Sequence, residues 1–150
     1  MITLAEKADT KELNEIISKE FPYKKLSKEN IAQRIKNPST IILKKTFRKR
    51  IAGFIDVEVK ENTGFINAIS VKETYRRKGF GKELINCALE VLRQNNILEA
   101  KLLVKKENLM AKKFYASIGF TFQIMHSKKI EDSIIEVWRK ELLEETNYLN

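Results

Sequence analysis

A basic, glycine-containing turn between a strand and a helix is the feature that most constrains this chain. Residues 65–71 read FINAISV, an apolar run of strand length, and from position 84 to position 92 apolar residues recur at helical spacing. The first amides of a helix have no partner inside it and lie at the positive end of its dipole, so they bind phosphate oxygens. The segment predicts an α/β fold with an anion-binding turn, built from Arg76, Arg77, Lys78, Gly79, Gly81 and Lys82.

Two common phosphate-binding loops do not fit this turn. A P-loop has a glycine five positions before its Gly-Lys pair and Ser or Thr after it, whereas Arg76 and Glu83 occupy those places. A dinucleotide fingerprint needs a third glycine at position 84, which is Leu84. Nucleotide hydrolysis and a Rossmann fold are therefore not supported. Alone, the segment also fits an ordinary turn with solvated lysines.

Hydrophobic periodicity, together with cap and turn signals, predicts an alternating order of elements along the whole chain. Asp9 and Ser27 are expected to cap the first two helices, Pro22 and Pro38 to limit them, and Gly119 to close the last. The three strands in the middle of the chain are expected to form an antiparallel meander. The predicted order is a short apolar start at Ile2 and Leu4, helices at 9–21 and 27–36, strands at 40–45, 51–60 and 65–71, a helix at 79–95, a strand at 100–105, a helix at 111–118, and strands at 120–127 and 134–140.

Composition fits one domain over residues 1–150. The 150 residues are 43% hydrophobic and 33% charged, enough apolar content to bury a core, and no repeat divides the chain. The net charge of +9 favours anionic partners such as nucleic acid, an acidic membrane or a polyphosphate ligand. Cys87 is the single cysteine, which excludes a disulfide framework and favours a cytoplasmic location. No apolar run approaches the roughly 20 residues of a membrane span, so we expect no membrane partner.

Two motifs together resemble the GNAT superfamily of N-acetyltransferases. The pattern Arg76-x-x-Gly79-x-Gly81 resembles its acyl-CoA pyrophosphate loop, and residues 108–120 resemble its segment Asn-x-x-Ala-x-x-Phe-Tyr-x-x-x-Gly-Phe. The pair is far more specific than either motif alone. The resemblance implies one N-acetyltransferase domain of the α/β (α+β) class, with a mixed, mostly antiparallel sheet of about six to seven strands, about four helices, and central strands that part to admit acetyl-CoA.

The resemblance also implies which residues bind acetyl-CoA, with no metal needed. The pantetheine arm of GNAT cofactors pairs with the strand ahead of the loop, here Ile69, Ser70 and Val71. Asn108 matches a residue that commonly contacts this arm, although asparagine there also caps a helix. The pyrophosphate is expected at the amides of Arg77, Gly79, Phe80, Gly81 and Lys82, with Arg76 in the motif's usual Arg or Gln place and Lys78 adding charge.

Tyr115 matches the residue that often protonates the departing CoA thiolate. Its alternative role is packing beside Phe114. The general base is left open, because the positions where some family members carry a glutamate hold no carboxylate here. Four candidates remain, none favoured over the others: Asp56, Glu58, Glu73 and His126.

The missing carboxylate favours an α-amine as acceptor, since its pKa lies near 8 and that of lysine near 10.4. Segments 75–79 and 21–23 also resemble protein N-terminal acetyltransferases, although segment 126–133 lacks tyrosines that those enzymes often carry. A protein N-terminus therefore ranks first, lysine second and a polyamine or other small amine third. The alternatives are a non-catalytic acyl-CoA sensor and a nucleic-acid-binding protein; for the basic hairpin at 44–50 we expect a solvated turn. The family also suggests a homodimer.

Overall fold

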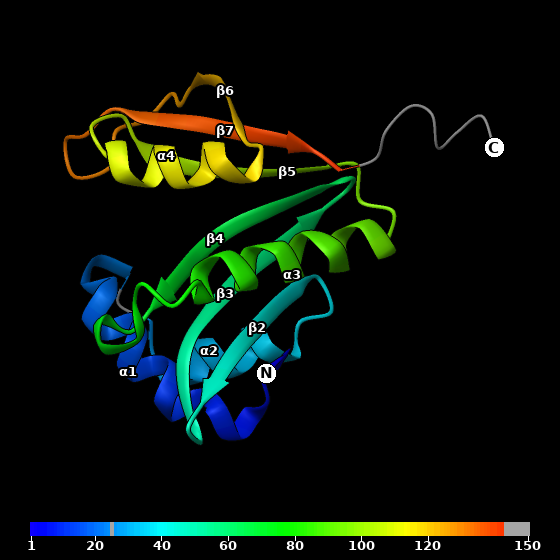
Figure 1. Ribbon diagram of the computed structural model, residues 1–150, viewed down its shortest axis with the longest axis vertical. Coiled ribbons are helices and arrows are strands. Elements are labelled where there is room, and N and C mark those ends of the chain that lie inside the picture. Colours follow the sequence, from blue (N-terminus) through cyan, green and yellow to red (C-terminus); the bar gives the residue numbers. More distant parts are fainter. Residues whose placement is uncertain (25, 143–150) are drawn as a thin grey trace.

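The computed structural model describes residues 1–24 and 26–142, which form a seven-stranded mixed sheet with four α-helices. The expected fold class is confirmed. The strands lie in the order β1-β2-β3-β4-β5-β7-β6 (Figure 1). Their bounds are β1 Ile2–Leu4, β2 Thr40–Phe47, β3 Arg50–Lys60, β4 Thr63–Val71, β5 Glu99–Lys105, β6 Thr121–Met125 and β7 Ile135–Glu141. The helices are α1 Thr10–Glu20, α2 Lys28–Lys36, α3 Phe80–Gln94 and α4 Leu109–Ile118, with short 3-10 turns at Lys7–Asp9, Pro22–Lys24 and Glu73–Tyr75.

Four of the five expected helix signals act as predicted, since α1 ends before Pro22 and α2 before Pro38. The Ser27 hydroxyl accepts a hydrogen bond from the Asn30 amide at the start of α2, and Gly119 ends α4 in the left-handed conformation with φ 110°. Asp9 precedes α1, but its carboxylate does not cap that helix. It accepts instead from the Glu6 amide at 2.7 Å, because a 3-10 turn before α1 uses Asp9 first.

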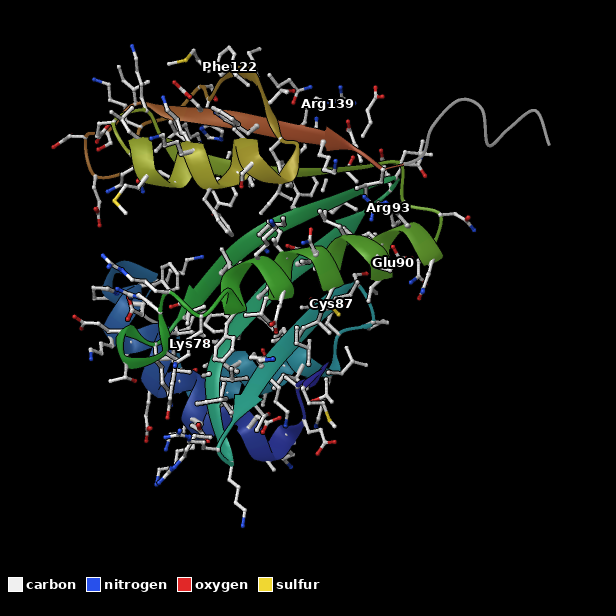
Figure 2. All side chains as sticks on the ribbon, viewed as in Figure 1. Lys78, Cys87, Glu90, Arg93, Phe122 and Arg139 are labelled. Atoms are coloured by element: carbon white, nitrogen blue, oxygen red, sulfur yellow. The ribbon has the colours of Figure 1, made fainter. Side chains whose placement is uncertain are left out.

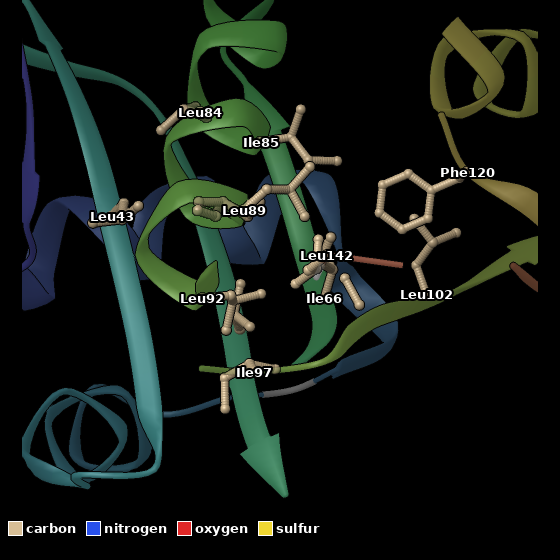
Figure 3. Close-up of a cluster of buried hydrophobic side chains, with 14 of the residues drawn as sticks. Leu43, Ile66, Leu84, Ile85, Leu89, Leu92, Ile97, Leu102, Phe120 and Leu142 are labelled. Atoms are coloured by element: carbon tan, nitrogen blue, oxygen red, sulfur yellow. The ribbon is translucent and has the colours of Figure 1, made fainter. Parts of the chain in front are cut away.

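The helices cover both faces of the sheet unequally. Helices α1 and α2 pack on one face over β2 and β3, around Leu13, Ile31 and Phe54. Helix α3 packs on the other face in the larger core, which continues past β5 to α4 (Figures 1 and 3). The face of β5, β7 and β6 that lies on the α1 and α2 side carries no helix of the described chain, and Leu103 there is 48% exposed.

The sheet divides between its two central strands. β4 and β5 run parallel and pair at four positions, from Thr63 with Glu99 to Ile66 with Leu102. Beyond these pairs the two strands diverge, and Figure 1 shows α3 and α4 on either side of the resulting gap. The rest of β4 pairs with β3 alone, so residues Ile69–Val71 have one unpaired backbone edge. The expected parting of the central strands is present.

Some element ends differ from the sequence-based expectation. The strand expected at 120–127 is limited to Thr121–Met125, because Phe120 turns into the core and is 1% exposed. Strand β2 continues two residues beyond position 45, since Phe47 still pairs with Arg50 across the hairpin. Within the described residues, no helix is both long and apolar enough to cross a membrane.

Candidate active site

The turn before α3 presents an unused set of backbone donors. The N–H groups of residues 77–82 donate to no acceptor within the described chain. Gly79 sits at the helix N-cap with φ 81°, a conformation that favours glycine, and a Cβ there would meet no atom within 4 Å. Arg77 also has a positive φ, of 65°. The turn therefore combines amides without an acceptor and open space at Gly79, two features that an anion site requires.

The two sequence motifs meet at Gly81. A Cβ built on Gly81 would lie 3.7 Å from Cζ of Phe114 and 3.8 Å from Cγ2 of Val71, both ordinary contact distances. Gly81 thus stands where the end of β4, the start of α3 and α4 come together, beside the unpaired edge of Ile69–Val71. The packing of the protein itself leaves room for a side chain there, so the glycine preserves open space for something else.

The cations of the turn have different surroundings. Arg76 points back to the protein: its guanidinium donates to the Val71 carbonyl at 3.0 Å and to the Glu20 carboxylate at 3.1 Å. This contact ties the turn to the end of α1. The side chains of Arg77, Lys78 and Lys82 are exposed around the free amides, and Figure 2 shows Lys78 projecting from the turn.

The second motif places a hydroxyl and an amide on α4. Asn108 caps α4, because its side-chain oxygen accepts from the Ala111 amide at 3.1 Å. The Tyr115 ring packs against Phe114 and Phe120, with ring centroids 5.4 and 6.0 Å away. Burial raises the pKa of the Tyr115 phenol above its ordinary value of 10.0, so the hydroxyl keeps its proton at neutral pH. Tyr115 therefore packs in the core and remains a proton donor, and both sequence-based roles are compatible.

A cavity of about 450 Å³ lies on the uncovered face of the sheet, opposite α3 and α4. Its lining includes Glu58, Lys60, Asn67, Lys101, Leu103 and His126. Asn67 and Leu103 are the first residues beyond the last β4–β5 pair, so the cavity reaches the point where the strands part. A molecule in this cavity could approach a group held in the gap from the opposite face of the sheet.

A strand bulge shapes this point. Asp56 pairs with Ala68 and Val57 with Ile66, so Asn67 is an extra residue in β4. Its carbonyl accepts a hydrogen bond from Nζ of Lys24 at 3.0 Å. Asn67 lines both the large cavity and a neighbouring cavity of about 220 Å³ that Lys24 also lines. Neither residue was expected in the site, because a bulge and its long-range partner leave no periodic signal in the sequence.

The four candidate bases have different surroundings in the structure. Asp56 is held by Arg34, whose guanidinium lies 2.6 and 2.9 Å from its two oxygens. Glu73 lies on the 3-10 turn before α3 and lines another cavity, with Glu15 and Lys72. Glu58 and His126 both line the large cavity. Nδ1 of His126 is 3.1 Å from both the amide nitrogen and the carbonyl oxygen of Lys128, which leaves Nε2 for the cavity.

Several side chains of the basic hairpin make contacts within the protein itself. Lys44 pairs with Asp9 at 2.7 Å and Lys45 with Glu83 at 2.6 Å. The Phe47 ring packs on Phe80 and Tyr75, each at 5.4 Å between centroids. Because its aromatic ring is already occupied, the hairpin does not present the combination of cations and stacking rings that single-stranded nucleic acid favours. Its tip, residues 48–50, is exposed, as expected of a solvated turn.

Comparison with known proteins identifies acetyltransferases. A family model described as "Acetyltransferase (GNAT) domain" matches residues 5–138. A spermidine N(1)-acetyltransferase from Thermoplasma acidophilum is 29% identical over 83 residues, which are 55% of this chain and 47% of that protein. The chain thus matches about half the length of this curated relative.

Solved structures share the fold at low sequence identity. The ribosomal-protein-S18-alanine N-acetyltransferase from Escherichia coli has a TM-score of 0.83 and 19% identity, covering 96% of this chain and 94% of that one. Ard1 from Thermoplasma volcanium has a TM-score of 0.82 and 23% identity, with 96% and 98% covered. PaiA N-acetyltransferase from Thermoplasma acidophilum, in complex with coenzyme A, has a TM-score of 0.78 and 22% identity, with 94% and 98% covered.

Proposed function

The chain belongs to the GNAT acetyltransferase family, and from that premise we propose that it transfers the acetyl group of acetyl-CoA to a protein N-terminal α-amine. The observation that carries the proposal is the gap between β4 and β5, which has the donor-rich turn and α4, the helix of Tyr115, on one face and a cavity on the other.

The residues of the gap fit the thioester cosubstrate. The edge of β4 at Ile69, Ser70 and Val71 that faces the gap has no strand partner and suits the pantetheine arm, although the Val71 carbonyl already accepts from Arg76. The free amides of residues 77–82, together with the exposed cations of the turn, suit a pyrophosphate. Asn108 lies at the start of α4 on the opposite side of the gap, where its side chain could reach the same arm while capping the helix.

Acetyl transfer needs one new bond and one broken bond. The acceptor nitrogen attacks the acetyl carbon and the carbon–sulfur bond breaks, so negative charge develops on sulfur. Tyr115 donates its phenolic proton there, a role that fits its place on α4 beside the gap; its raised pKa keeps that proton in place at neutral pH. The proton lost by nitrogen leaves on the opposite face of the sheet, where the cavity holds Glu58 and His126.

The acceptor side supports an α-amine. The cavity is open along an uncovered sheet face, which suits the end of an extended chain. An α-amine also needs less help in losing its proton than a lysine side chain does. One solved structure carries a name that fits a protein acceptor, the ribosomal-protein-S18-alanine N-acetyltransferase. The spermidine N(1)-acetyltransferase match supports a second candidate, a polyamine or other small amine.

Mass spectrometry with a mixed acceptor pool tests the proposal. The pool contains peptides with free N-termini, N-blocked lysine peptides and polyamines, each incubated with acetyl-CoA and the protein. Acetylated N-termini, reduced with Tyr115→Phe, are the expected result. Acetylation of polyamines alone would assign the second candidate, and tight acetyl-CoA binding with no acetylated acceptor would favour a sensor.

We also propose a cytoplasmic location and a homodimer. The location rests on the single cysteine, which suits a reducing compartment. The dimer rests on the edge strand β6, whose outer backbone edge is unpaired within the described residues and where Phe122 is 50% exposed (Figure 2). Analytical ultracentrifugation checks the dimer, since a sedimentation coefficient of a monomer at all concentrations would contradict it.

A further inference from the structure

The charges around the acceptor cavity follow from the strand register. Glu58 of β3 pairs with Phe65 of β4, which pairs with Lys101 of β5, so these three residues form one row across the sheet. Lys60 lies two residues after Glu58 and on the same face of β3. Glu58 and the two lysines thus stand on adjacent sides of one cavity.

Glu58 is the one carboxylate in the lining of this cavity as the described residues form it. It makes no ion pair within the described chain, unlike its strand neighbour Asp56, which Arg34 neutralises. A single free carboxylate is a suitable counter-ion for one ammonium group. It can hold the acceptor amine beside the point where β4 and β5 part.

Lys60 and Lys101 differ in the carboxylates that lie near them. Lys60 is exposed and pairs with no carboxylate of the described residues. Lys101 lies 3.5 Å from Glu99, but the same carboxylate also binds Arg139 at 2.9 Å and Thr63 at 3.1 Å. Arg139 also reaches Glu141 at 3.4 Å, so Glu99 is not its only partner. Among the described residues that line the cavity itself, two lysines stand against one carboxylate, Glu58.

From this arrangement we propose that the acceptor is an acidic N-terminal peptide, whose α-amine meets Glu58 and whose carboxylate side chain meets Lys60 and Lys101. The inference rests on the proposed acetyl transfer. Two residues along a strand span about 7 Å and two strand spacings about 10 Å. An extended peptide covers that separation in two to three residues, so the acidic side chain belongs to the second or third residue of the acceptor.

The same charges act against polyamines. A polyamine carries a second ammonium a few ångströms from the reacting one, and Lys60 or Lys101 would meet it with like charge. The overall charge of +9 has the same sign and would slow the approach of a polycation while attracting an acidic chain. Charge thus separates the two acceptor candidates that the similar proteins leave open.

Kinetics with matched peptides test this inference. Three peptides share one sequence and differ at residues 2 and 3, which are Glu-Asp, Gln-Asn or Lys-Lys; spermidine is the fourth acceptor. We expect kcat/KM for the acidic peptide to exceed that for the neutral one roughly three- to tenfold, as partly exposed charge pairs give. The difference should lie in KM and should shrink as salt rises from 50 to 500 mM, because salt screens exposed charges.

Charge variants identify the responsible residues. The pair Lys60→Gln and Lys101→Gln should abolish the preference, and Lys60→Gln alone should reduce it, since that exposed side chain has no structural partner to lose. Lys60→Arg should retain it. Lys11→Gln, on the exposed face of α1, is the control for net charge and should change nothing.

The outcomes are distinguishable. Equal use of acidic and neutral peptides, better use of the Lys-Lys peptide or spermidine, or a preference unchanged in the double variant would overturn the inference while acetyl transfer stands. Absence of transfer to every acceptor, with no acetyl-CoA binding, would overturn the proposed function and this inference with it.

Discussion

Arg34 of α2 holds Asp56 of β3 through two hydrogen bonds, from Nη2 to Oδ1 at 2.6 Å and from Nε to Oδ2 at 2.9 Å. The Asp56 side chain is 10% exposed, so its carboxylate depends on this bidentate partner. The hydrogen bond to Asp56 raises the pKa of Arg34 above its ordinary value. Of two carboxylates on one face of β3, the buried one therefore joins α2 to the sheet, and Glu58 is free to meet a ligand.

Removing the Asp56 charge should weaken the fold. We expect Asp56→Asn to lower the free energy of unfolding by about 2 to 3 kcal/mol, somewhat less than for a fully buried pair because Arg34 remains partly exposed. Urea denaturation checks this value. Glu58→Gln is the matched control, with a stability change below about 0.5 kcal/mol and a raised KM for the acceptor. Equal destabilisation of the two variants would show that the assignment of roles is wrong.

Two glycines of the turn should respond differently to alanine. Gly79→Ala forces a side chain into a left-handed conformation and should cost about 1 kcal/mol of stability. Gly81→Ala meets only ordinary contacts and should leave stability unchanged or slightly raised, yet weaken acetyl-CoA binding by filling the open space. Thermal unfolding and calorimetric titration separate the two effects. Undiminished acetyl-CoA affinity in Gly81→Ala would place the cosubstrate elsewhere.

Tyr115→Phe should affect turnover rather than binding. We expect kcat to fall about 100-fold, within the usual range for loss of a positioned acid, and the dissociation constant for acetyl-CoA to change less than about twofold. Because burial raises the pKa of Tyr115, ionisation of its phenol should not reduce kcat until the pH exceeds 10.0. Tyr75→Phe, which leaves the ring against Phe47, is the control. Unchanged kcat in Tyr115→Phe would leave the residue with packing alone.

Glu99 should make stability dependent on acid pH. Burial alone would raise the pKa of Glu99, but hydrogen bonds from Arg139 and Thr63 bring it below its ordinary value of 4.5. A carboxylate with a lowered pKa stabilises the folded state fully above 4.5 and loses that contribution as the pH falls through its folded-state pKa. The stability difference between the protein and Glu99→Gln, at most about 1 kcal/mol for these partly exposed pairs, should therefore shrink between pH 6 and pH 3. A constant difference in urea titrations across that range would contradict the lowered pKa.

The order of the elements could be predicted because its signals are local. Apolar spacing within a helix or strand, the Ser27 cap and the Gly119 helix end all depend on residues a few positions apart. The motifs at 76–81 and 108–120 likewise gave the family, since each is contiguous. The structure brings the two motifs together at Gly81.

The acceptor side could not be predicted in the same way. The bond from Lys24 to the bulge at Asn67 and the pairing of Arg34 with Asp56 join residues that are 43 and 22 positions apart. Such contacts depend on strand register and on where a helix crosses the sheet. For that reason the sequence left four candidate bases open, and the structure distinguishes them by their partners.

The four β4–β5 pairs join the two strands at one end only. The last of these pairs is formed by Ile66 and Leu102, and both side chains are buried. Any change in the angle between β4 and β5 would displace their outer ends, near Val71 and Lys105, more than Asn67 and Leu103 beside the last pair. Pairing between β4 and β5 therefore fixes the positions of Asn67 and Leu103 closely, whereas the width of the gap at Val71 and Lys105 is left to the packing of the neighbouring elements.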